Sequence, residues 1–267
     1  MRVSLLAADR VGNAVLGLFE FVGALASFGA RVALEAFRPP YEPREIARHV
    51  YQFGYRSAPL ILTAGAAIGV VLSMHTRASL ERFGAEAMIP AGLAIALIRE
   101  TGPLTAGLLV SGRVGAGIGA EIGAMKVTEQ IDALEANAVD AFKYLAVTRV
   151  IALMIAMPLL TIIMDSSGIL GGYLAETAVS GMSWRLYLQS AFSYIAYSDI
   201  ILATMKTVVF GYLIAVVSGY LGFRTSNGTE GVGEASTRSV VMASVLIILS
   251  DVILVKMIFF FYPAVTG

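Results

Sequence analysis

Cysteine is absent from this 267-residue chain, and charged residues make up only 14% of it. Without thiols the chain forms no disulfide, no thiolate metal site and no cysteine nucleophile. Its 19 basic and 19 acidic residues cancel to a formal net charge of zero, which leaves no basis for nucleic-acid binding through bulk charge. Soluble domains carry roughly 25% charged residues, so this chain has too few polar side chains to cover the surface of a soluble globule.

Apolar residues dominate instead, at 57% of the chain with a mean hydropathy of +0.78. A bilayer core about 30 Å thick needs about 20 apolar residues in a helix. Four or five segments qualify, and none alternates with period two as a membrane barrel requires. We place the spans at about 58–74, 87–110, 150–174, 200–221 and 240–262. The sequence therefore predicts an all-α integral membrane protein.

The segment 11–30 is ambiguous. It is long enough to span, but it contains Asn13, Glu20 and several glycines. This mixture is more typical of an amphipathic helix in the membrane interface than of a sixth span. We therefore predict one membrane domain over residues 1–267, with an interfacial helix and linker at 1–50 and a five-span bundle at 55–267.

The placement of Lys and Arg predicts the orientation. Thirteen of the 19 fall in segments on the side of the N-terminus, three fall in the opposite loops, and three fall within spans. Because cytoplasmic loops carry the excess of Lys and Arg, the N-terminus is predicted to be cytoplasmic and the C-terminus external. The outer loop 175–199 contains Trp184, Tyr187, Tyr194 and Tyr197, which indicate an interfacial aromatic belt.

Several nucleotide and catalytic motifs are missing. No Gly-Lys dipeptide occurs, so there is no P-loop, and neither HExxH nor GxSxG occurs. Residues 115–120 match a dinucleotide fingerprint, but they follow a predicted membrane helix rather than a strand.

Closely spaced small residues predict close approach of helix backbones, either within the chain or between two copies. They are Gly65/Gly69, Gly115/Gly119/Gly123, Gly168/Gly172 and Gly211/Ala215/Gly219.

Five ionisable residues fall at membrane depth: Arg99, Glu100, Asp165, Lys206 and Asp251. Each costs a few kcal/mol or more if it faces lipid, so we expect each to face protein or a wet cavity. Adjacent positions on a helix differ by about 100°, so Arg99 and Glu100 need partners on other helices, with Lys206 or Asp251 as candidates. Two interpretations stay open: buried pairs that fix helix packing, and a polar patch in a substrate pathway.

The inner connection contains a helical pattern over residues 121–135. Met125, Thr128, Asp132 and Glu135 share one stripe of that helix. A short acidic helix of this kind suits docking of a soluble partner, although a solvated surface helix has the same pattern.

Four segments carry a resemblance to a known family. They are Arg-Glu-Thr-Gly-Pro at 99–103, Ser-Gly-Arg at 111–113, and the longer runs 120–134 and 228–241. These resemble the signatures of the MlaE-type permeases, the membrane subunits of bacterial ABC systems that move phospholipid between inner and outer membranes. The resemblance extends from about residue 45 to the end. The chain departs from it at Ala141 and Thr148, where the family commonly has proline, and in the run 135–138.

The resemblance implies a homodimer that encloses a lipid cavity in the bacterial inner membrane and maintains the lipid asymmetry of the outer membrane. It also implies a separate cytoplasmic ATPase pair, a small STAS-domain subunit and a periplasmic ring of MCE-domain proteins. This chain would bind no cofactor, because ATP and magnesium would bind to the partner ATPase. The C-terminus would be periplasmic.

The resemblance also implies that Arg99, Glu100 and Lys206 lie near a lipid site and that the region 121–135 couples to the ATPase. We predict the other pathway residues from this mechanism and from charge at membrane depth. Those assigned to the lipid pathway are Arg99, Glu100, Lys206, Asp251, Val71, Leu72, Met74 and Leu97. Those assigned to ATPase coupling are Glu121, Met125, Lys126, Thr128, Glu129 and Asp132. Two rival functions remain, an ion-coupled secondary transporter and a membrane scaffold that only anchors a peripheral complex.

Overall fold

The computed structural model describes the backbone of residues 2–261, and it describes the side chains from residue 16 onward except that of Leu18. Every regular element in this part of the chain is a helix. Five helical rods are long and apolar enough to cross a membrane: Pro43–Phe83, Glu86–Val127, Lys143–Ser180, Tyr197–Phe223 and Gly228–Phe261. The prediction of an all-α fold with five spans is confirmed. The rods exceed the predicted spans because each helix continues past its apolar run.

The eleven α-helices of the described chain follow one another with short connections. They are α1 (Arg2–Ala36), α2 (Pro43–Val50), α3 (Ala58–Leu80), α4 (Ile89–Ala96), α5 (Gly102–Val110), α6 (Ala116–Val127), α7 (Gln130–Ala136), α8 (Thr148–Ser180), α9 (Trp184–Ala191), α10 (Tyr197–Phe223) and α11 (Gly228–Phe261). Single π-helical turns connect α4 to α5, at Leu97–Thr101, and α5 to α6, at Ser111–Gly115. The second span is therefore one rod with two local widenings.

Helix α8 forms the centre of the bundle. It packs against α3 on one side and α10 on another, and it is the most buried of the five spans. Leu153, Met157 and Leu160 on α8 are fully buried, as is Phe210 on α10. By contrast, α3 and α11 leave most of their surface uncovered, so these two spans offer the faces that lipid or another protein would contact.

Glycines let the central helices approach one another closely. A Cβ added at Gly69 on α3 would overlap the backbone of Gly168 on α8, and one at Gly211 on α10 would overlap the backbone of Leu153. No residue with a side chain fits at either crossing. These contacts lie within one chain, so for these residues the structure supports packing inside the protomer rather than between copies.

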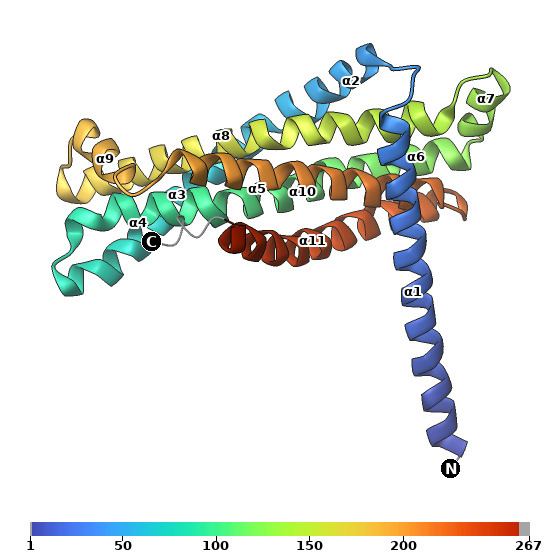
Figure 1. Ribbon diagram of the computed structural model, residues 1–267, viewed down its shortest axis with the longest axis horizontal. Coiled ribbons are helices and arrows are strands. Elements are labelled where there is room, and N and C mark those ends of the chain that lie inside the picture. Colours follow the sequence, from blue (N-terminus) through green and yellow to red (C-terminus); the bar gives the residue numbers. More distant parts are fainter. Residues whose placement is uncertain (1, 262–267) are drawn as a thin grey trace.

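Helix α1 lies across the bundle rather than along it. Figure 1 shows α1 crossing the ends of the spans near α6 and then leaving the bundle at a steep angle to them. Its C-terminal half is held by Phe28, whose ring lies 5.2 Å from Phe142 and 5.8 Å from Tyr220, and by Arg31, which stacks 4.0 Å above Phe142. This direction favours a helix in the plane of the membrane over a sixth span.

The opposite end of the bundle has the short helix α9 (Figure 1). Trp184 contacts Tyr173 at 4.6 Å between ring centroids, and Tyr187 lies 5.4 Å from the same ring. Tyr187 is fully buried, so it differs from the predicted interfacial belt, whereas Trp184, Tyr194 and Tyr197 are exposed. Burial, with a smaller effect of the Glu176 carboxylate, raises the pKa of Tyr187, so its hydroxyl stays protonated.

The predicted single helix over 121–135 is wrong, because the structure divides it. Helix α6 ends at Val127 and α7 begins at Gln130, with Glu129 between them in the left-handed conformation at φ 58°. Met125 and Asp132 therefore do not share a stripe. The ammonium of Lys126 crosses the bend to the Asp132 carboxylate at 3.3 Å. We call residues 121–136 the α6–α7 elbow.

The left-handed backbone at Glu129 gives a testable result. Changing Glu129 to valine should destabilise the elbow by about 1–2 kcal/mol, because a β-branched side chain is strained at positive φ. Glu129→Gly should be tolerated at the same site, because glycine adopts this conformation freely. Hydrogen exchange of the amides in α7 measures the difference, and equal protection in both variants would contradict the conformation described for Glu129.

Candidate functional site

The ammonium of Lys206 on α10 holds together three elements in the interior. It lies 2.9 Å from the carboxylate of Glu100, which follows α4, and 2.9 Å from that of Asp251 on α11. The Lys206 and Asp251 side chains are almost completely buried, whereas Glu100 is partly exposed. The prediction that the partners of this group lie on other helices is therefore confirmed for Glu100, and Lys206 is that partner.

A proline in the second span explains a further contact of Lys206. Pro103 has no N–H to donate to the carbonyl of Arg99 four residues earlier. The ammonium of Lys206 donates to that carbonyl at 3.0 Å instead. The π-helical turn Leu97–Thr101 widens the helix at this point, and such turns are frequent at functional sites. One lysine thus satisfies a freed backbone group and two carboxylates.

Arg99 pairs with a residue that the sequence did not indicate. Its guanidinium donates to the buried carboxylate of Asp199 at 3.1 Å. The same oxygen of Asp199 accepts the N–H of Ala196 at 3.0 Å, so Asp199 also caps the first turn of α10. The apolar pattern predicts Asp199 at the end of an outer loop, outside the spans. An acidic residue in the first turn of a helix was the available signal, because carboxylates are favoured there.

Asp165 on α8 is buried, as predicted for an ionisable residue at membrane depth. Its Oδ1 has no hydrogen-bond partner among the described residues. That oxygen lies against Gly102 in the second span, where a Cβ would overlap it. The glycine after Thr101 therefore makes room for a carboxyl group beside the Lys206 cluster.

A small cavity adjoins this cluster. It has a volume of about 40 Å³ and is lined by Arg99, Glu100 and Lys206 on one side and by Val255 and Phe259 on the other. This space admits a few water molecules but not a lipid. The charged groups of one chain thus adjoin the apolar outer part of α11, and no lipid-sized space is enclosed there.

The apolar residues assigned to the lipid pathway divide into two groups. Val71 and Met74 on α3 are exposed on the uncovered face of that helix, and Leu72 beside them is half-buried. Leu97 is fully buried and packs where Gly168 leaves space. Of these four residues, the three on α3 can contact an acyl chain in this conformation, whereas Leu97 cannot.

The elbow residues are tied to the bundle through Glu121. Its carboxylate accepts a hydrogen bond from the buried guanidinium of Arg149 on α8 at 2.8 Å. Arg149 also donates to the carbonyl of Leu145 at 2.8 Å. Sequence reasoning assigned Glu121 to coupling but missed Arg149, which joins α6 to the central helix. A charged residue at the start of an apolar helix was the only signal.

The other residues assigned to coupling lie along the elbow. Met125 and Lys126 are half-buried on α6, and Thr128, Glu129 and Asp132 are exposed beyond it. The elbow projects from the end of the bundle that also contains α1 (Figure 1). An exposed acidic bend, fixed to the central helix by the ion pair of Glu121 with the buried Arg149, has the geometry to transmit a push from outside the membrane.

Comparison with known proteins assigns the chain to a family. The family model described as Permease MlaE matches residues 46–257. The chain belongs to the MlaE permease family. A probable ABC transporter permease protein of Rickettsia bellii is 37% identical over 252 residues, which cover 94% of this chain and 97% of the relative. The family consists of transport subunits, so this chain is an ABC permease rather than an enzyme.

Two further relatives of this permease have informative names. The intermembrane phospholipid transport system permease protein MlaE of Haemophilus influenzae is 32% identical over 256 residues, covering 93% of this chain and 96% of that protein. The chloroplastic protein TRIGALACTOSYLDIACYLGLYCEROL 1 of Arabidopsis thaliana is 33% identical over 234 residues, covering 88% of this chain and 66% of that protein.

The two departures from the family pattern lie at the exit from the elbow. Ala141 is buried, and Thr148 donates from its hydroxyl to the carbonyl of Tyr144 at 2.6 Å. A π-helical turn at Lys143–Val147 runs directly into α8 at Thr148. The chain at Thr148 is therefore continuous helix, without the break that a proline in a helix interior produces.

Proposed function

We propose that this permease moves phospholipid between the inner and outer membranes of a bacterium and so maintains the lipid asymmetry of the outer membrane. Two copies would form the lipid cavity, and a separate cytoplasmic ATPase with its own ATP and magnesium would drive them. The observation that carries this proposal is the match to the MlaE family over residues 46–257, supported by the similarity to an intermembrane phospholipid permease.

The geometry of the second, fourth and fifth spans supports a lipid pathway. Arg99, Glu100, Lys206 and Asp251 form a charged cluster next to an apolar surface, which suits a molecule with a charged head and apolar chains. The cavity of one chain is too small for a lipid, and α3 and α11 are largely uncovered. A second copy facing these helices would enclose a larger space.

Within that space each group has a proposed task. The exposed residues Val71 and Met74, with Leu72 beside them, would contact acyl chains, and Leu97 would join them if α4 moves away from α8. Arg99 or Lys206 would attract the phosphate, because both carry positive charge at the cavity wall. Glu100 and Asp251 would hold Lys206 in place rather than contact lipid.

We propose that the ATPase acts on the permease through the elbow. The ATPase would dock on Glu129 and Asp132, and α6 would carry its motion through the Glu121–Arg149 pair into α8. The elbow end would be cytoplasmic, since the positively charged segments gather there. A STAS-domain subunit would accompany the ATPase, and an MCE-domain ring would accept the lipid at the periplasmic end.

Charge reversal of the elbow tests this proposal. Purification of the tagged chain from native membranes in mild detergent should recover an ATP hydrolase and bound phospholipid. Glu129→Lys together with Asp132→Lys should remove most of the hydrolase, because two exposed acidic contacts become repulsive. Glu86→Lys, an exposed change at the opposite end of the bundle, is the matched control and should retain it.

Retention of the hydrolase by the elbow variant would contradict the docking site. Recovery of neither hydrolase nor phospholipid with the unaltered chain would contradict the proposed function as a whole.

A further inference from the structure

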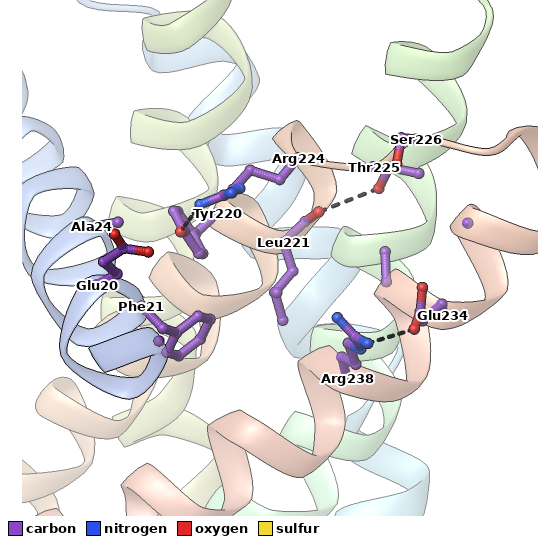
Figure 2. A pocket seen from close by; sticks show the side chains of 13 residues that line it. Glu20, Phe21, Ala24, Tyr220, Leu221, Arg224, Thr225, Ser226, Glu234 and Arg238 are labelled. Atoms are coloured by element: carbon purple, nitrogen blue, oxygen red, sulfur yellow. Dashed lines mark hydrogen bonds and ion pairs between the residues drawn. The ribbon is translucent and has the colours of Figure 1, made fainter. Parts of the chain in front are cut away.

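A cleft separate from the Lys206 cluster lies between α1, the end of α10 and the start of α11. Its volume is about 590 Å³. Figure 2 shows Glu20 and Phe21 of α1 on one side, Arg224 at the end of α10, and Arg238 of α11 across from them. Neither the lipid pathway nor the elbow uses these residues. The cleft is far larger than the 40 Å³ space beside Lys206.

The cleft is lined by charges of both signs. The guanidinium of Arg224 donates to the hydroxyl of Tyr220 at 2.5 Å, and Arg224 forms no ion pair within the described part of the chain. Arg238 pairs with Glu234 at 2.6 Å on the exposed surface of α11. Glu20 faces into the cleft from α1 (Figure 2). Two guanidinium groups and two carboxylates thus surround one space.

The position of the cleft matches the depth of lipid head groups. Val241 is the first exposed large apolar residue of α11, and it lies three residues after Arg238, which is about 4.5 Å along a helix. On α1, the exposed apolar residues Leu16, Phe19 and Val22 flank Glu20. The cleft therefore lies at the boundary between the apolar surface of the spans and their polar ends.

Aromatic contacts at the base of the cleft hold α1 against the bundle. The ring of Phe21 lies 5.6 Å from that of Tyr220, edge to face, and the hydroxyl of Tyr220 is the group that positions Arg224. A molecule bound to Arg224 and Arg238 would therefore join α1 and α10 to α11.

We propose that this cleft binds the head group of a zwitterionic aminophospholipid from the leaflet at the elbow end of the bundle. The phosphate lies between Arg224 and Arg238, where planar guanidinium groups donate charge-assisted hydrogen bonds. The ammonium group faces Glu20, and the acyl chains follow the apolar surface of α11. The inference uses the proposed membrane orientation but not lipid transport, so the site can exist whether or not the chain moves lipid.

Photo-cross-linking at the cleft tests this inference. Gly17 lines the cleft, and a side chain added there meets nothing within 4 Å, so p-benzoylphenylalanine fits at this position. Irradiation of native membranes that contain the full chain should give an adduct with the mass of phosphatidylethanolamine. Combining R224Q with R238Q should lower the yield about tenfold, because the charge-assisted bonds to phosphate are lost.

Two comparisons make the result specific. Arg185→Gln changes an exposed arginine on α9 at the opposite end and should leave the adduct unchanged. Glu20→Gln should lower the yield with phosphatidylethanolamine more than with phosphatidylglycerol, because only the former has an ammonium group. An equal fall in yield with both lipids in the Glu20→Gln variant would contradict the assigned role of Glu20.

Two results would overturn the inference: an adduct with a protein in place of lipid, or equal yields from the double variant and the unaltered chain. Lipid transport, measured separately, reports on the proposed function. Absence of lipid transport together with an unchanged adduct would contradict the proposed function but not the head-group site in the cleft.

Discussion

Lys206→Met is expected to destabilise the permease by about 3–5 kcal/mol, because removal of one partner leaves buried charge without compensation. The variant keeps Asp251 buried and Glu100 beside it, with no ammonium 2.9 Å from either. It also leaves the carbonyl of Arg99 without its donor. Thermal unfolding in mild detergent, together with the yield of folded protein, measures the effect.

Two further variants separate the effect of uncompensated buried charge from the general effect of replacing a lysine by methionine. Lys256→Met, which changes an exposed lysine five residues beyond Asp251 on α11, should have little effect. Adding Glu100→Gln and Asp251→Asn to Lys206→Met should recover much of the stability, because no uncompensated charge remains. If the triple variant is as unstable as the single one, the cluster is not held by charge balance.

Gly69→Val is expected to be the next most damaging change, with a loss of about 3 kcal/mol or more. The Cβ of any residue at position 69 overlaps the backbone of Gly168, and a backbone cannot rotate away as a side chain can. Helices α3 and α8 would have to separate, which would open the largest helix contact of the bundle. Size-exclusion chromatography and thermal unfolding should show the loss.

Gly117→Val is the matched control for this effect. It makes the same change on α6, where an added Cβ meets nothing within 4 Å. Both variants share the small cost of valine in a helix, so the difference between them reports the crossing alone. Equal stability of the two would mean that α3 and α8 do not cross at Gly69.

Local pattern was sufficient for much of the fold. Long apolar runs predicted all five spans, because each helix satisfies its own backbone in lipid and needs no distant partner for that. Charge at membrane depth pointed to Arg99, Glu100, Lys206 and Asp251, because such residues are expensive and require partners wherever they occur. The rule that adjacent helix positions diverge also indicated that the partners lie on other helices.

Pairings between side chains of different helices were harder to predict from the sequence. Lys206 was identified as a candidate partner because it lies within a predicted span, but the pairing of Arg99 with Asp199 was not, since the apolar pattern placed Asp199 in an outer loop. The ion pair of Arg149 with Glu121 was missed because it joins two separate helices, and the sequence does not show which faces of α6 and α8 meet. The bend lies at Glu129 rather than at a glycine, so no residue in the sequence indicated it, and the pattern over 121–135 predicted one continuous helix.

The sequence by itself determined that the chain is an all-α membrane protein that resembles a permease family, that Asp165, Lys206 and Asp251 are buried in it, and which end carries the acidic segment. Only the tertiary structure decided which carboxylate meets which cation, where the elbow bends, and that α1 lies across the spans to form a charged cleft. The physical reason is the separation along the sequence of the residues that decide each feature. Helix formation and burial in lipid depend on residues a few positions apart, whereas ion pairs and clefts depend on how whole helices pack.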